Sequence, residues 1–168
     1  MNIIFFVTTL SVILIVLYLT LFFSLGSRIK KSEDFIVDIF LEKMSKIPAV
    51  IEVMRPYVAD PNATFCHMTR LHSEGIIHEY TTIHMLMEHN ARINDQYSFL
   101  MKLSMAIPDL QKDTYFLYIR DFVMSYDRMM RTELPIFNTH IRKWNWFINL
   151  KNWTLIGYVL PGRKYLEV

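Results

Sequence analysis

The first 27 residues constrain the fold most, because the stretch from Met1 to Ser27 contains no charged side chain. About 20 apolar residues are enough to cross the hydrocarbon core of a bilayer as one α-helix. The segment therefore predicts an N-terminal transmembrane helix over residues 1–27, in contact with the lipid bilayer through residues 2–26. A cleavable signal peptide is the alternative, since Ser24 and Gly26 are small enough for a cleavage site. The apolar run is too long for one, however, and it lacks a basic n-region.

Basic residues directly after this segment predict its orientation. Arg28, Lys30 and Lys31 follow the apolar run, and no basic side chain precedes it. Cytoplasmic flanks carry the excess of lysine and arginine in single-pass proteins. We therefore expect a single-pass protein of the cytoplasmic membrane, with its N-terminus outside and a cytoplasmic domain over residues 28–168.

Composition favours an all-α domain and excludes nucleic-acid binding. The chain has 168 residues, of which 52% are hydrophobic and only 4 are glycine, and no segment alternates with period two. Lys plus Arg (18) nearly balance Asp plus Glu (16), so no basic field exists that would attract a nucleic acid. The single cysteine, Cys66, cannot form an intramolecular disulfide and is expected to be a small buried hydrophobe.

Apolar periodicity predicts three long helices. Spacings of three and four residues are typical of a helix with one buried face. The first soluble helix is expected to continue the membrane helix, with a bend at Pro48, and the second runs from Ala63 to about Met105. Pro108 ends that helix and Asp113 caps the third. We expect an antiparallel bundle of these three helices plus a short C-terminal helix. The first stripe comprises Ile36, Phe40, Met44, Ile47, Ile51, Met54 and Val58, and the third comprises Tyr115, Ile119, Phe122, Tyr126, Met129, Ile136 or Phe137, Ile141, Trp144 and Ile148.

An aromatic residue followed by asparagine occurs twice in the third helix, at Phe137-Asn138 and Trp144-Asn145. Seven residues return a helix to within about 20° of the same face, so the two pairs lie one above the other. A partly buried asparagine needs partners for its carbonyl and its amide, and in helical bundles it commonly fixes the register. We therefore predict a register role for both pairs. A contact with a ligand or a partner is the alternative.

These motifs resemble the LemA family of membrane-anchored helical proteins. The matching marks are Pro108-Asp109-Leu110, the two aromatic-Asn pairs, the closing segment from Gly157-Tyr158 to Tyr165-Leu166-Glu167, and Ile47-Pro48 in the first soluble helix. The resemblance implies an N-terminal anchor, a cytoplasmic helical bundle and a role in scaffolding or membrane-compartment biogenesis. The family's pairs usually begin with tyrosine, whereas these begin with Phe137 and Trp144.

Five histidines in the predicted second helix raise the possibility of a metal site. They are His67, His72, His78, His84 and His89. Metal-binding pairs on one helix lie three or four positions apart, and these are separated by five or six. We expect no metal ligand, no cofactor, no catalytic residue and no small-molecule substrate. A metal-binding or enzymatic bundle that uses this His-rich helix remains the alternative function.

All three tryptophans fall near the end of the chain, among basic residues. Trp144, Trp146 and Trp153, with Lys143 and Lys151, are the candidate partner-binding residues. Such a segment also suits a membrane interface. Three long helices, however, would place it at the far end of the bundle from the membrane. We therefore expect a membrane-anchored scaffold or assembly subunit that forms homo-oligomers or binds a partner protein within a membrane complex. A membrane-surface sensor is a third possibility.

Overall fold

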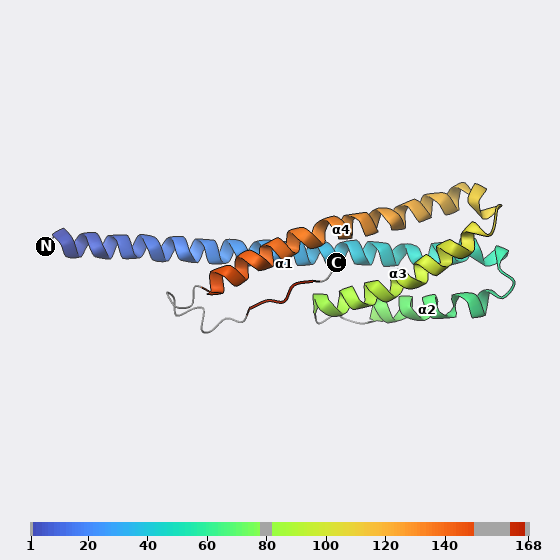
Figure 1. Ribbon diagram of the computed structural model, residues 1–168, viewed down its shortest axis with the longest axis horizontal. Coiled ribbons are helices and arrows are strands. Elements are labelled where there is room, and N and C mark those ends of the chain that lie inside the picture. The colour runs from blue at the N-terminus through green and yellow to red at the C-terminus, as the bar shows by residue number, and fades with distance from the viewer. Residues whose placement is uncertain (1, 78–81, 150–161, 167–168) are drawn as a thin grey trace. The chain divides into compact units, whose positions relative to one another are not determined.

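The computed structural model describes residues 2–77, 82–149 and 162–166, and over these ranges the protein is all-α, as predicted. Its helices are α1 (Asn2–Met54), α2 (Pro61–Ile77), α3 (Ile83–Met105) and α4 (Thr114–Asn149). Short 3-10 turns, η1 (Arg55–Tyr57) and η2 (Leu110–Lys112), precede α2 and α4. Figure 1 shows α1 as one continuous helix.

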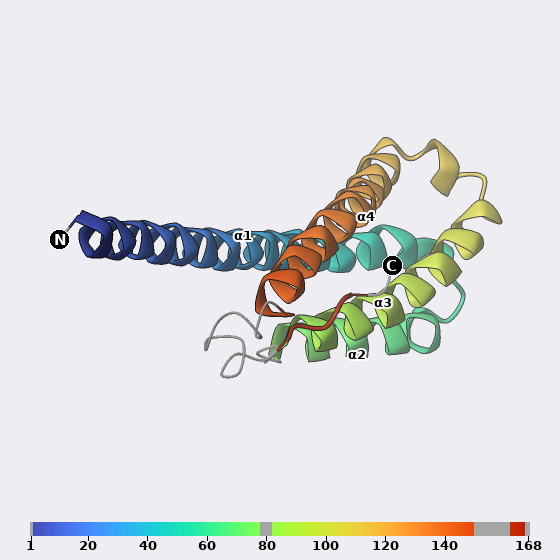
Figure 2. The ribbon, with the colours of Figure 1, turned by 60° about the vertical axis from the view of Figure 1, so that its left-hand side comes forward.

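The chain forms two compact units. The first unit comprises residues 1–34 and 135–167, and the second unit comprises residues 35–134. Both α1 and α4 contribute residues to each unit. The second unit also holds α2 and α3, which contact each other and lie side by side in both ribbon views (Figures 1 and 2).

The N-terminal half of α1 is the apolar segment singled out in the sequence. It is the one helix in the described part of the chain that is long and apolar enough to cross a membrane. Large apolar side chains in this half are exposed, including Phe5 at 75% and Leu14 at 58%. Farther along α1, where polar residues are interspersed among apolar ones, most large apolar side chains are buried, although Phe35 and Leu41 are exposed. The uncovered part of α1 therefore ends, and the packed part begins, where the sequence changes from uniformly apolar to apolar on one face only.

The single helix expected over residues 63–105 is instead two helices, α2 and α3. Thr82 caps the start of α3, because its hydroxyl accepts a hydrogen bond from the Met85 amide at 3.4 Å. The polar stretch Glu88 to Asp95, which the sequence suggested as a kink, lies inside α3. The predicted short C-terminal helix falls largely outside the described residues, and residues 162–166 are not helical.

Two aspartates cap the helices that follow them, and of these Asp113 was predicted. Asp113 accepts hydrogen bonds from the amides of Tyr115 and Phe116 at 2.8 and 2.9 Å and so caps α4. Asp60 accepts one from Ala63 at 3.0 Å at the start of α2, where Pro61 takes the first helical position. Pro48 and Pro135 lie inside α1 and α4 without ending them.

Apolar periodicity located the buried face of α1 correctly and that of α4 only in part. Six of the seven predicted α1 positions, from Ile36 to Met54, are buried, and Val58 is half-buried. In the first half of α4 Ile119 is buried as predicted, but at other positions the buried residue is the one after the predicted one. Tyr115 and Met129 are exposed, whereas Phe116 and Met130 are buried. Tyr115 and Tyr126 were assigned to the buried face of α4 because their rings are apolar. Their hydroxyls, however, favour water.

Candidate functional site

The first unit contains an aromatic cluster between α1 and the last turns of α4. Tyr18 stacks on Phe147 with ring centroids 4.5 Å apart, and Phe22 lies 5.2 Å from Trp144. Gly26 is next to Trp144, since a Cβ added to this glycine would lie 3.7 Å from its indole ring. The end of α4 therefore packs on the last turns of the apolar stretch of α1. Sequence reasoning expected this segment at the end of the bundle farthest from the apolar helix, whereas Trp144 and Phe147 lie against that helix.

Asn138 and Asn145 bind the backbone of an extended segment, residues 162–166, which we call the clasped segment. The Asn145 side-chain amide donates to the Arg163 carbonyl at 2.8 Å, and its Oδ1 accepts from the Arg163 amide at 2.9 Å. Asn138 forms the same pair of bonds with Leu166, at 2.7 and 2.9 Å. Each asparagine thus uses both of its polar groups on one residue, as a backbone peptide group does in a sheet.

The distance between Asn138 and Asn145 along α4 matches the distance between Arg163 and Leu166 along the clasped segment. Seven residues of α-helix rise about 10.5 Å, and three residues of polyproline II helix rise about 9.3 Å. A β-strand would present alternate residues to the same side, whereas Arg163 and Leu166 are three apart, which is the polyproline II period. Because Arg163 pairs with Asn145 and Leu166 with Asn138, the clasped segment runs antiparallel to α4.

Side chains add two anchors to the clasped segment. The Arg163 guanidinium donates to the Glu33 carboxylate at 3.1 Å and lies 5.5 Å from the centre of the Trp144 ring. Leu166 is 3% exposed, so its side chain contributes to the core of the first unit. Lys164 and Tyr165, between the two anchors, are exposed. The segment is therefore held by its backbone and by every third side chain.

The predicted site residues separate into buried and exposed groups. Phe137 and Trp144 are buried, at 1% and 6% exposure, and Asn138 and Asn145 are half-buried. Trp146 is 66% exposed. Lys143, Arg28, Lys30 and Lys31 are also exposed. Trp153 and Lys151 lie outside the described residues. Of the candidate partner-binding residues in the described part of the chain, Trp146 and Lys143 thus face solvent while Trp144 packs inside.

A buried lysine in the second unit was missed by sequence reasoning. The Lys43 side chain on α1 is 1% exposed, and its Nζ lies 2.7 Å from Asp127 Oδ1 on α4. It also donates to Oδ1 of Asn90, at 3.0 Å, and to Oδ1 of Asn94, both on α3. The sequence of α3 does indicate a polar site in the core. Asn90 and Asn94 are four residues apart and share a helical face with the apolar residues Leu86, Ile93 and Tyr97, which are buried.

Three acceptors match the three N–H donors of a lysine ammonium group. Burial lowers the pKa of Lys43 below its usual 10.5, and the charge of Asp127 partly opposes that shift. Burial also raises the pKa of the nearby Tyr97 phenol, whose hydroxyl donates to the Arg120 carbonyl at 3.4 Å. The cluster therefore holds one buried cation, one carboxylate that is 27% exposed, and a neutral phenol.

The described histidines do not gather at one site. His67 and His72 lie on α2, and His84 and His89 lie on α3, while His78 falls outside the described residues. His89 Nε2 donates to the Leu71 carbonyl at 2.9 Å, which ties α3 to α2. Burial lowers the pKa of His72 from its usual value. Among residues 2–77, 82–149 and 162–166, no group of three His, Cys, Asp or Glu side chains is arranged to hold a metal ion.

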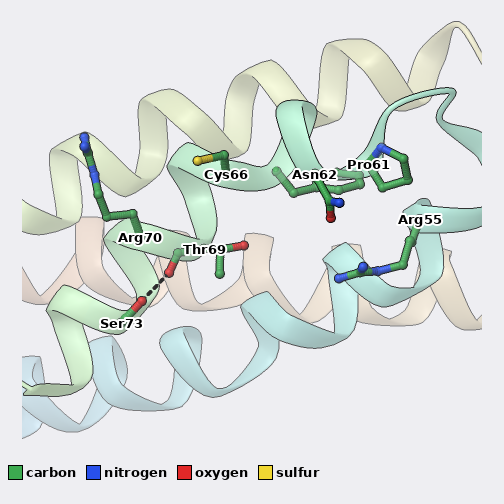
Figure 3. Close-up of a pocket in the computed structure, with 8 residues that line it drawn as sticks. Arg55, Pro61, Asn62, Cys66, Thr69, Arg70 and Ser73 are labelled. Carbon is green, nitrogen blue, oxygen red and sulfur yellow. Dashed lines mark hydrogen bonds between the residues drawn. The ribbon is translucent and has the colours of Figure 1, made fainter.

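A shallow pocket of about 430 Å³ lies along α2 in the second unit (Figure 3). Cys66 lines it and is exposed, so the expectation that this cysteine is buried is wrong. The two arginines in its lining already have acidic neighbours. Arg55 lies 3.3 Å from Glu52, and Arg70 lies 3.6 Å from Glu74. The pocket thus offers an accessible thiol beside two cations whose charges are already partly balanced.

No protein-family model matches the chain, and a search of curated proteins finds no match either. The candidate site therefore rests on its geometry alone.

Proposed function

We propose that this chain is a single-pass membrane protein whose helical domain serves as a scaffold, through self-association or through a partner protein of a membrane complex. The uncovered half of α1 carries the proposal. Burying one large apolar side chain is worth about 1.5–3 kcal/mol, and consecutive side chains from Ile4 to Leu17 are exposed. A bilayer removes that surface from water. We further propose that residues 28–168 form an antiparallel bundle on the cytoplasmic side.

The exposed face of α4 in the first unit supports an assembly role. Ile136, Thr139, Lys143 and Trp146 follow the three- and four-residue spacing of one helical face, and all four are exposed. Ile136 is 44% exposed and Trp146 is 66% exposed. Tryptophan is enriched in protein interfaces and among the residues that contribute most to binding. Next to it, Phe147 stacks on Tyr18 of the apolar helix, which suits a contact close to the bilayer surface.

The family resemblance seen in the sequence agrees with this function. We propose that the chain is a LemA-like protein, and we assign it no catalytic role.

Crosslinking in native membranes tests the proposal. Lysine-reactive crosslinking of the full chain, followed by mass spectrometry, is expected to give recurrent links from Lys143 to a second copy or to one other membrane protein. Trp146→Ala should abolish these links. Tyr115→Ala is the matched control, because Tyr115 is an aromatic residue on α4 with similar exposure, 57%, in the second unit. Unchanged links in Trp146→Ala would show that this face is not the assembly surface.

A further inference from the structure

The two asparagines recognise the clasped segment mainly through its backbone. All four hydrogen bonds from Asn138 and Asn145 end on the amide or the carbonyl of Arg163 or Leu166. Backbone groups are the same for every residue except proline, so this recognition sets conformation and direction and leaves most of the sequence free. The same arrangement of α4 is therefore able to accept any extended peptide that presents a residue at each of the two positions.

Two side-chain contacts narrow the choice of peptide. Glu33 and the Trp144 ring face the guanidinium of Arg163, so the first position favours a cation that can both form an ion pair and stack. The buried position of Leu166 favours an aliphatic side chain. The two residues between them, Lys164 and Tyr165, are exposed and impose no requirement. The chemical class of ligand is thus an extended peptide of the pattern basic-x-x-aliphatic, antiparallel to α4.

The clasped segment lies at the surface and makes few contacts. Residues 162–165 are exposed, and the Arg163 side chain is 41% exposed although it is ion-paired. Single hydrogen bonds to the backbone add little net stability, because water replaces them when the segment leaves. Four such bonds, one surface ion pair and one buried leucine make an interface small enough to open and close reversibly.

A second copy of the chain is the occupant best matched to this site. Every copy carries the same Arg163-to-Leu166 segment, which fits the asparagines of any other copy as it fits its own. Twelve residues connect the end of α4 to the segment, and a chain of that length spans at most about 40 Å. Anchoring in one membrane plane holds copies close together and raises their effective concentration.

We propose that Asn138 and Asn145 form a clamp for extended peptides, and that copies of this protein associate by inserting residues 162–166 into each other's clamps. This inference deepens the self-association proposed above and rests on it. The exchange is symmetric, because the same segment and the same clamp are contributed by each copy, so it closes as a dimer.

Complementation between two defective variants tests the exchange. One variant, Asn138→Leu/Asn145→Leu, keeps the segment and loses the clamp. The other, Arg163→Asp/Leu166→Asp, keeps the clamp and loses the segment. Each full-length chain carries one of two different affinity tags, and pairs are recovered from membranes solubilised in mild detergent. We expect each variant to lose pairing with itself, and the co-expressed mixture to regain it, because the segment of the first fills the clamp of the second.

Two controls keep the outcome interpretable. Tyr115→Ala should pair as the unaltered chain does, because Tyr115 is an exposed residue of the second unit and belongs to neither the clamp nor the segment. Helical circular dichroism of each variant must match that of the unaltered chain. A variant that fails this check is replaced by Asn145→Leu or Leu166→Asp alone, which disturbs one of the two pairings.

The possible results separate this inference from the proposed function. If both variants still pair with themselves, while Trp146→Ala abolishes pairing, the scaffold proposal stands and segment exchange is overturned. If neither the variants nor their mixture pair, although the unaltered chains do, exchange is also overturned, because each clamp then serves only its own chain. If unaltered chains fail to pair at all, self-association falls, and exchange falls with it.

Discussion

At the scale of single residues, Lys43 makes the second unit sensitive to pH. Burial lowers its pKa, so in the range between the lowered value and 10.5 the unfolded chain binds the proton and the folded chain does not. The free energy of unfolding therefore rises with pH through that range. At pH values below the range Lys43 is charged in both states, so the folded protein carries the full cost of burying that charge.

Replacing Lys43 with methionine should remove this pH dependence. Lys43→Met has a similar volume and no charge, so its unfolding free energy should lack the rise toward pH 10 that the unaltered chain shows. Thermal unfolding in detergent, followed by circular dichroism between pH 7 and about 10, compares the two. Measurements stop there because burial raises the pKa of Tyr97, whose phenol ionises earlier in the unfolded chain and lowers stability above its usual value of 10.0. Parallel pH profiles for both proteins would contradict the assignment.

Asn138 offers a second test at this scale. Asn138→Asp keeps an oxygen that accepts from the Leu166 amide, but its other oxygen then faces the Leu166 carbonyl, which also only accepts. We expect the clasped segment to detach at neutral pH and to return as the carboxyl is protonated, near pH 4 for an ordinary aspartate. The protection of the Leu166 amide against hydrogen exchange, corrected for the intrinsic rate, should thus rise in acid only in the variant. Asn138→Leu is the control and should not recover.

At the scale of helices, Pro135 is a local defect that α4 tolerates. It lies inside the helix, where proline removes a backbone donor and crowds the carbonyl one turn earlier. Pro135 is exposed, so an alanine there loses no core packing. Pro135→Ala should therefore stabilise the protein by about 1–3 kcal/mol, seen as a higher midpoint of thermal unfolding. An unchanged or lower midpoint would mean that the fold requires proline at this position.

Sequence periodicity and capping residues predicted most of the helices because those signals are local. Asp113 caps α4 by bonding to amides within three residues, and the α1 stripe follows from the helical repeat alone. The division of residues 63–105 into α2 and α3 was missed, because no proline marks it. Gly75 is the only glycine in that stretch, and it lies inside α2.

Candidate-site residues were predicted only where the signal lies within one helix. The seven-residue spacing identified Asn138 and Asn145 and predicted that they need partners, but it could not say where those partners lie. Their partners are Arg163 and Leu166 on a non-helical segment, which has no apolar periodicity to mark it in the sequence. Lys43 was missed for a related reason: its buried position depends on acceptors from α3 and α4, far away in the sequence.

At the scale of the whole molecule, Cys66 is a built-in reporter of topology. It is the single cysteine of the chain and is exposed on α2. If residues 28–168 are cytoplasmic, a membrane-impermeant maleimide should leave Cys66 unlabelled in intact cells and label it after the membrane is permeabilised. Replacing Arg28, Lys30 and Lys31 with glutamine should increase labelling in intact cells, because these charges hold the domain inside. Cys66→Ser is the blank, and equal labelling before and after permeabilisation of the unaltered chain would reverse the orientation.

The division into units has a consequence for biosynthesis. The first unit joins residues 1–34 to residues 135–167, and the ribosome must add all of residues 35–134 between them. At about 5–20 residues per second, this interval lasts roughly 5–20 s. During that time Tyr18, Phe22 and Glu33 have been made, but their partners on α4 and in the clasped segment have not. A nascent chain therefore presents these groups before α4 and the clasped segment exist, so a chaperone is able to contact them before those parts of the protein do.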